Sequence, residues 1–347
     1  MAALPVPIAG GSIAELRDHV RITDDSWPLV VGWLVGAIAP RGPYPVLVLR
    51  GQHGAGKSSG ARRLRSLIDP SIAPIRCEPR EPRDLVITAR ASHVVCLDNL
   101  SSVPSWLSDG LCRLATGGGY AARALFTDAD EIVIDVQRPT ILTGITDVVT
   151  APDLLDRSLL VELDAIPPED RETERRLDER WRASHPRLLG ALYSAVSMAL
   201  ARRDALKIAR LPRLADWAAW ATAAAPALGL PDDAVIAALE GQAEEATEIA
   251  LDASIIARPL CSWIRSRVDP AWVGTAAELL ATLTERADLG VTRDKAWPKT
   301  ARGLAGMLAR LAPALAAGGV RVERLARGSG GVRDGRGWRV ERVGGES

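Results

Sequence analysis

The chain has 347 residues, a formal net charge of zero at pH 7, and 47% hydrophobic residues with few aromatic ones. This length supports two or three domains, and the balanced charge excludes a molecule that binds polyanions through its overall charge. The four cysteines lack C-x-x-C and Cys/His spacings, which excludes the common structural zinc sites and a disulfide framework.

The first segments in chain order indicate a protein without membrane spans. Residues 1–26 are punctuated by glycine and proline and show no signal-peptide pattern, so we expect an N-terminal arm or linker. Apolar spacing over Trp27–Ala39 predicts a helix. The longest apolar run, Pro28–Pro40, is too short to cross a bilayer, and we therefore expect a cytoplasmic protein with no membrane partner.

Strand-like and helix-like segments then alternate up to residue 164. Short continuous apolar runs such as VLVL and VVCL are typical of buried parallel strands. We expect residues 27–164 to form a three-layer α/β domain around a largely parallel sheet. The predicted strands are Val46–Arg50, Ile75–Cys77, His93–Leu97, Thr140–Thr143 and Leu159–Leu163.

The second half of the chain differs from the first in composition and in apolar spacing. Residues 165–268 carry Ala/Leu-rich helical patterns and are expected to form an all-α domain. In residues 269–347, a helix capped by Thr275 and Glu278, a helix after Pro298, and two strands around a glycine-rich loop predict a winged helix-turn-helix. From Trp272 onward there are 13 Arg and Lys against 8 Asp and Glu, which is a weak indication of nucleic-acid binding.

The strongest motif is GQHGAGKS, which matches G-x-x-x-x-G-K-[ST] between a predicted strand and a predicted helix. Loop amides and the helix N-terminus would hold the phosphates of ATP, Lys57 would reach the β- and γ-phosphates, and Ser58 would bind Mg²⁺. The motif therefore predicts a P-loop NTPase domain. The expected nucleotide-binding residues are Gly51, Gln52, His53, Gly54, Ala55, Gly56, Lys57, Ser58 and Ser59.

A second acidic position follows about 40 residues later, where the apolar strand HVVCL ends at Asp98. This is the Walker B arrangement, in which the carboxylate holds Mg²⁺ through water. Asn99 follows where many ATPases place a glutamate that activates the attacking water. An amide orients a water without taking its proton, so hydrolysis is slow or another carboxylate serves as the base.

From Gly51 to Leu163 the order of motifs resembles the AAA+-type ATPases, and within them the superfamily 3 helicases of phages, viruses and mobile elements. The segments that carry the resemblance are WLSDGLCRLATGGG, the hairpin YAARALFTDADEIVIDV, RPTILTGI and PDLLDRSLLVEL. The resemblance implies that Arg123 is the hairpin arginine, that Thr143 takes the sensor position usually held by Asn, and that Arg157 acts on a neighbouring subunit's nucleotide. It also implies a homo-oligomer, in the form of a hexameric ring, that works with a separate primase or other replication protein.

Several alternatives remain open for these residues. Arg157 could instead form a salt bridge with Asp153 or Asp156, and Arg123 could have a structural role in the hairpin. The hairpin turn, residues 127–130, is acidic and would repel DNA. The expected DNA contacts of the tail are Lys299, Arg302 and Arg310 on the second helix and Arg327, Arg333 and Arg336 in the wing, although such domains also bind proteins.

Two functions follow from these residues. The first is an oligomeric, ATP-hydrolysing, helicase-like ATPase that acts on DNA in the replication of a phage, plasmid or integrated element, with Lys57, Asp98, Asn99, Thr143 and Arg157 as catalytic residues. The second is a slow or non-hydrolysing ATP switch that controls DNA binding or protein assembly without unwinding.

Overall fold

The computed structural model describes residues 2–118, 120–123, 131–134, 136–144, 147–208, 211–326 and 337–343. The chain divides into two compact units, each with its own hydrophobic core. The first unit comprises Met1–Val149 with Leu154–Gln242, and the second comprises Thr150–Asp153 with Ala243–Ser347.

The centre of the first unit is a four-stranded parallel sheet in the order β2-β5-β1-β6. Four of the five predicted strands are present, with ends shifted by at most three residues. The strands are β1 (Val46–Arg50), β2 (Val95–Leu100), β5 (Thr140–Gly144) and β6 (Ser158–Glu162). The strand predicted at Ile75–Cys77 is wrong, because Arg76 makes only an isolated bridge to Leu97 between Pro74 and Pro79.

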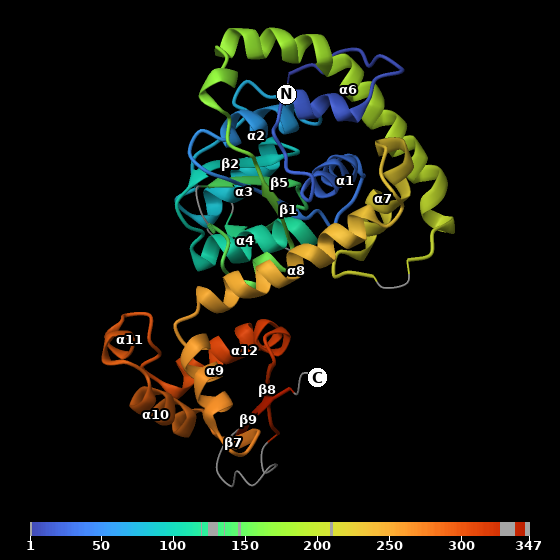
Figure 1. Ribbon diagram of the computed structural model, residues 1–347. Helices are drawn as coiled ribbons and strands as arrows, with labels where there is room; N and C mark the ends of the chain where they lie inside the picture. Colours follow the sequence, from blue (N-terminus) through green and yellow to red (C-terminus); the bar gives the residue numbers. More distant parts are fainter. Residues whose placement is uncertain are drawn as a thin grey trace. The chain divides into compact units, whose positions relative to one another are not determined.

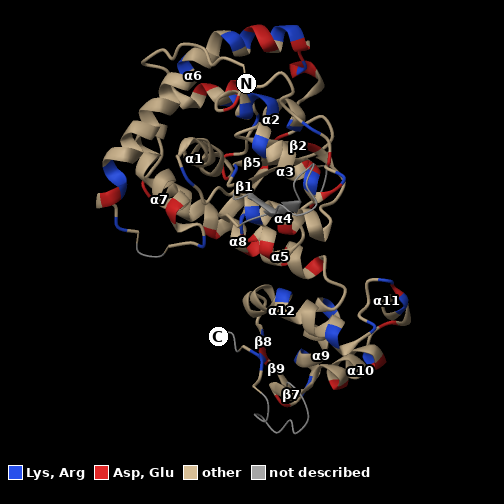
Figure 2. Cartoon of the chain, turned by 180° about the vertical axis from the view of Figure 1, so that it is seen from behind, with Lys and Arg blue, Asp and Glu red and all other residues tan. Residues whose placement is uncertain are grey.

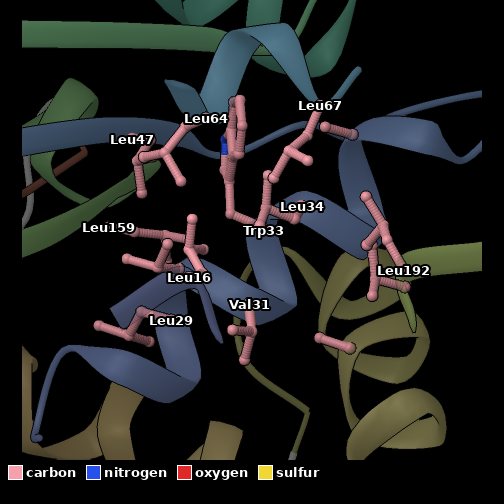
Figure 3. Close-up of a cluster of buried hydrophobic side chains, with 14 of the residues drawn as sticks. Leu16, Leu29, Val31, Trp33, Leu34, Leu47, Leu64, Leu67, Leu159 and Leu192 are labelled. Carbon is pink, nitrogen blue, oxygen red and sulfur yellow. The ribbon is translucent and has the colours of Figure 1, made fainter. Parts of the chain in front are cut away.

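Helices cover both faces of this sheet (Figure 1). The predicted first helix is present as α1 (Trp27–Ile38), and α2 (Lys57–Ser66) packs against β1, β2 and β5. Alternate residues of β1, Leu47 and Leu49, enter the core that α1 and α2 share, where Figure 3 shows Leu47, Leu64, Trp33 and Leu159 together. The remaining helices of this part are α3 (Pro82–Ala91), α4 (Ser105–Thr116) and α5 (Pro152–Leu155).

The segment expected to be an N-terminal arm contributes to the same core. A short 3₁₀ helix, Ile13–Asp18, begins at a capping box formed by Ser12 and Glu15. Leu16 and Ile22 are buried, and Ile22 bridges to Leu163 after the end of β6. The apolar spacing of this segment therefore anchors it against the sheet, in spite of its glycines and prolines.

The helical part that follows the sheet packs into the first unit as well. α6 (Glu174–Arg202) and α7 (Ala215–Ala224) contact α1. Short 3₁₀ turns precede α6 (Pro168–Asp170), lie between α6 and α7 (Arg203–Ala205) and follow α7 (Ala225–Leu228). A Cβ on Gly36 would lie 2.2 Å from Cδ1 of Trp217, so a glycine lets α7 approach α1. This partition ends the first unit at residue 242, within α8 (Ala234–Asp252), whereas a separate all-α segment was expected over 165–268.

The second unit is built of helices and a three-stranded antiparallel sheet in the order β7-β9-β8. Thr275 and Glu278 form the predicted capping box at the start of α10. Trp297 and Trp338 are buried in its core. The elements are α9 (Ala257–Ser266), β7 (Ala271–Thr275), α10 (Ala276–Arg286), α11 (Leu289–Arg293), α12 (Ala301–Ala317), β8 (Val320–Arg324) and β9 (Gly337–Arg342).

Two further observations bear on the sequence predictions. The predicted hairpin is present as the antiparallel pair β3 (Tyr120–Arg123) and β4 (Glu131–Ile134), while its acidic turn lies outside the described residues. Among the helices that the structure describes, none has the length and apolar character needed to traverse a bilayer.

Candidate nucleotide site

The loop between β1 and α2 has the backbone conformation that a phosphate cradle requires. Gly51, Gly54 and Gly56 have φ values of 139°, 83° and 76°, which residues other than glycine rarely adopt. A Cβ on Gly51 would lie 2.7 Å from the carbonyl oxygen of Leu163. Glycine is therefore needed at Gly51 both for the turn and for the close approach of the chain that follows β6.

Lys57 lies at the first turn of α2, and its side chain folds back over the loop. Its Nζ donates hydrogen bonds to the carbonyl oxygens of Gly51 at 2.7 Å and of Gln52 at 2.9 Å. An ammonium group held on these carbonyls is close to the loop amides that would bind phosphate oxygens. The arrangement gives the loop a fixed positive charge beside the helix N-terminus.

Asp98 and Asn99 lie on a β-bulge near the end of β2. Three steps along β2, from Leu97 to Leu100, pair with two steps along β5, from Leu142 to Gly144. Asn99 has a φ of 56°, a left-handed conformation that asparagine tolerates better than glutamate. The bulge redirects the side chains at this edge, and it gives a physical reason for asparagine at the position where many ATPases have glutamate.

Thr143 contacts both of these residues from the neighbouring strand β5. Its buried hydroxyl donates to Oδ1 of Asp98 at 2.6 Å and accepts from the backbone N–H of Asn99 at 2.9 Å. A hydroxyl has one proton to donate, and Asp98 takes it. The structure therefore gives Thr143 a positioning contact to the carboxylate of Asp98.

The order of the strands brings these groups to one edge of the sheet. All four strands are parallel, so the loop after β1 and the bulge of β2 lie at their carboxyl ends, with Thr143 on β5 between them. β1 and β2 are separated by one strand, or about 10 Å. The hydroxyl of Ser58 and the half-buried carboxylate of Asp98 are hard oxygen donors that fit Mg²⁺ with water completing the shell.

A second feature of β2 is a cysteine whose thiol is not available for thiolate chemistry near this edge. Cys96, two residues before Asp98, is fully buried, and burial raises the pKa of its thiol to about 12. The thiol is therefore neutral at pH 7 and serves as a core side chain. Within the described residues, no group of three or more His, Cys, Asp and Glu side chains is arranged to hold a metal ion.

Arg157 lies at the amino ends of the strands, opposite the carboxyl ends where the loop and Asp98 lie. It directly precedes β6, and its carbonyl oxygen accepts from the N–H of Val46 at the start of β1, at 2.9 Å. The length of β1 therefore separates Arg157 from the loop of its own chain, about 15 Å. Asp156, one of its two candidate salt-bridge partners, pairs with Arg213.

Residues 163–171 form a strap over the loop that the sequence pattern does not predict. Ile166 would be 3.1 Å from a Cβ on Gly56, and Nη2 of Arg171 would be 3.7 Å from a Cβ on Gly54. Arg21 pairs with Asp170 at 2.7 Å and ties this strap to the N-terminal segment. Arg171 stands in the charged run PPEDRETERR, and nothing in that run distinguishes it from the arginines that follow.

The expected DNA contacts in the second unit have different surroundings. Nζ of Lys299 donates to the carbonyl oxygens of Thr292 at 3.1 Å and Asp294 at 3.4 Å, where α11 ends. Arg302 and Arg310 are exposed on α12, whose remaining surface is mostly uncharged (Figure 2). Arg327, Arg333 and Arg336 lie outside the described residues, and of Arg123 only the backbone, in β3, is described.

Comparisons with solved structures give only distant likenesses. The apo structure of the NrS-1 C-terminal region is 12% identical with a TM-score of 0.42, and the match covers 98% of this chain and 77% of that one. The Aeropyrum pernix ORC1 protein in complex with DNA is 13% identical with a TM-score of 0.25, covering 98% of this chain and 91% of that one. Both TM-scores indicate only a distant similarity of structure. No curated protein matches the sequence significantly.

Two protein families match the chain in consecutive segments. Residues 16–241 match the actinomycete integrative conjugative element replication protein, and residues 256–346 match the AICE RepA C-terminal domain. The boundary between the compact units, at residues 242 and 243, directly follows the first matched segment and precedes the second. The first match spans well over half of the chain, and the chain therefore belongs to the family of actinomycete integrative conjugative element replication proteins.

Proposed function

We propose that this replication protein is an ATP-binding and ATP-hydrolysing, oligomeric ATPase that acts on DNA. The observation that carries the proposal is the placement of Lys57 and Asp98 at one edge of the sheet, with Thr143 bonded to Asp98 between them. A cation on a glycine-rich loop and an oriented carboxylate near it are the two groups that a nucleoside triphosphate with Mg²⁺ requires.

Each residue has one task in this proposal. Residues 51–59 and the ammonium of Lys57 bind the phosphates, and Ser58 and Asp98 hold Mg²⁺, which when bound neutralises charge on the phosphate oxygens. Thr143 keeps the Asp98 carboxylate in one orientation by using its only proton on Oδ1. Asn99, exposed and on the bulge, orients a water next to the site.

The site is completed by a neighbouring copy of the chain. Arg157 lies at the far edge of the sheet from its own loop, which supports a role at another subunit's nucleotide over a role at its own. Repeated head-to-tail contacts of this kind close into a ring, and a hexamer is the ring we propose. In the oligomer Arg157 stabilises the negative charge that develops as the γ-phosphate leaves.

The second unit anchors the ATPase to DNA in this proposal. The order helix, strand, three helices and two strands, with β9 between β7 and β8, fits a winged helix-turn-helix. The surface of α12 offers Arg302 and Arg310 among Gly303, Gly306 and Ala309. This composition supports contacts to phosphates more than the reading of base edges.

A second candidate function is supported by the chemistry of two residues, Asn99 and Thr143. Asn99 has no carboxylate to take a proton from water, and the hydroxyl of Thr143 is committed to Asp98. A site with these features would bind ATP and cut it slowly. The chain would then be an ATP-dependent switch that gates DNA binding or the recruitment of a primase or another replication protein.

Steady-state ATP hydrolysis by the full chain separates the two functions. We expect single- or double-stranded DNA to stimulate turnover, Lys57→Ala to abolish it, and Arg157→Ala to reduce it by about 10³-fold or more. Arg213→Ala is the matched control, because Arg213 pairs with the neighbouring Asp156 and should leave turnover unchanged. Binding of ATP without turnover above the Lys57→Ala background would favour the switch.

A further inference from the structure

A cavity lies between α2 and α6, next to the phosphate loop. It has a volume of about 290 Å³ and is lined from α2 by Ser59 and Arg62 and from α6 by Glu174, Asp178 and Trp181. Figure 1 shows the first turns of α6 beside α2, and Arg62 contacts Glu174 at 3.8 Å. This volume is near the lower end of ligand sites, which suits part of a nucleotide better than a whole one.

The cavity begins where the phosphate loop ends. Ser59 directly follows Ser58, so a ligand whose phosphates lie on residues 51–58 passes Ser59 at the point where the phosphate chain ends. The strap of residues 163–171 closes the loop on its other side, near Gly54 and Gly56. The cavity along α2 offers a place for the rest of the ligand next to Ser59.

The walls of the cavity combine an apolar surface with polar groups. Trp181 is buried against His19 and His185, with the guanidinium of Arg63 5.6 Å from its ring centroid, so it is part of the lining without offering a free ring face. Burial beside Arg63 and Arg180 lowers the pKa of His19 to about 4, so His19 carries no imidazolium at pH 7. Pro70, Pro74 and Leu177 add the apolar surface that suits a planar heterocycle.

Several polar groups of the lining are committed to the protein itself. Arg63 donates to the carbonyl oxygen of Leu177 at 3.4 Å, Ser66 donates to that of Arg63 at 2.8 Å, and Arg65 is paired with the buried Asp69. The hydroxyl of Ser59 and the carboxylate of Asp178 are in the lining, and Glu174 has an exposed contact to Arg62 at 3.8 Å that a ligand would displace at little cost. Carboxylates accept from N–H and O–H donors, which are the polar groups of a nucleobase and a ribose.

We propose that this cavity binds the nucleoside half of the nucleotide, with Glu174 and Asp178 as the residues that distinguish a nucleotide from a bare polyphosphate. The inference rests on the proposed function, because it requires phosphates on the loop of residues 51–58. It adds the location of the sugar and the base, and it names the two side chains of α6 that contact them.

The test compares ATP with inorganic tripolyphosphate, which fills the phosphate loop alone. In the full chain with Mg²⁺, the Glu174→Ala/Asp178→Ala variant should lower the ratio of ATP affinity to tripolyphosphate affinity by about tenfold or more. Glu179→Ala is the matched control, since Glu179 is on the same helix and pairs with Arg175 outside the cavity. Using the ratio removes the general effect of deleting negative charges near a polyanion.

A photolabel on the base locates it independently of these variants. With 8-azido-ATP we expect cross-links within residues 70–74 or 177–181. An unchanged affinity ratio together with labelling elsewhere would overturn the cavity assignment while leaving the phosphate loop intact. If Lys57→Ala also left tripolyphosphate and ATP binding unchanged, the proposed nucleotide site itself would be overturned.

Discussion

The hydroxyl of Thr143 donates to Oδ1 of Asp98 across 2.6 Å while it accepts from the N–H of Asn99, so one buried side chain fixes two consecutive residues of the adjacent strand. The three residues lie where β2 bulges away from β5. Because the proton of Thr143 is used on Asp98, we expect Thr143 to influence the proposed nucleotide site through this carboxylate.

Thr143→Val should remove this hydrogen bond with little change in volume. We expect turnover at saturating ATP to fall about tenfold or more, because a hydrogen bond to a charged group is lost, and the requirement for Mg²⁺ to rise. Thr143→Ser keeps the hydroxyl and should retain most of the activity. Titration of turnover against Mg²⁺ checks both variants, and a Thr143→Val protein with the wild-type Mg²⁺ profile would show that Asp98 needs no such support.

Asn99 offers a test of what limits hydrolysis. Asn99→Asp supplies a carboxylate and tolerates the φ of 56°, so we expect faster turnover if the missing base is the limit. Asn99→Gln is the control that keeps the amide without adding a base. Turnover in Asn99→Asp at or below the wild-type rate would place the slow step elsewhere.

A buried ion pair connects the end of α2 to the start of β2. Arg65 and Asp69 are both nearly inaccessible and lie 3.2 Å apart, and Asp69 also accepts from the N–H of Val94 at 3.0 Å. Asp69→Ala should lower the free energy of unfolding by about 3–5 kcal/mol, because it leaves a buried guanidinium without its partner. Arg62→Ala, which breaks the exposed contact to Glu174, should cost less than about 1 kcal/mol in the same urea titration.

The sequence predicted the parts of this protein that depend on local chemistry. The loop from Gly51 to Ser58 and the capped helix after Thr275 are specified by residues within a few positions of each other. The bulge at Asp98 and Asn99 depends on pairing with β5, some 45 residues away, and carries no local signal. Arg171 could not be predicted for the same reason, because its contact with the loop depends on the chain after β6 folding back over Gly54.

Long-range packing also set the extent of the two units. Trp263 of α9 and Val340 of β9 share one buried core, so α9 belongs with the C-terminal elements although its sequence reads as a continuation of the helical region. The glycine at Gly36 that admits Trp217 likewise joins α7 to α1 across about 180 residues. Neither contact is visible in the periodicity of a single segment.

The second unit permits a test of DNA binding by charge. Arg302→Ala and Arg310→Ala in the full chain should each weaken binding to duplex DNA of any sequence and reduce the slope of log affinity against log salt by about 0.9. Lys299→Ala is the contrasting variant, because its ammonium is bound to the carbonyl oxygens of Thr292 and Asp294 and should contribute little. Equal effects of all three substitutions would contradict the proposed role of α12.

The proposed ATPase site is shared between two copies of the chain. Lys57→Ala removes the phosphate-binding cation from one subunit's own loop, and Arg157→Ala removes the group that it lends to its neighbour. Each variant alone should be inactive, and mixing the two should restore measurable ATP turnover, since some interfaces then combine an intact loop with an intact Arg157. Full activity of Arg157→Ala alone, or a mixture as inactive as its two components, would contradict the account.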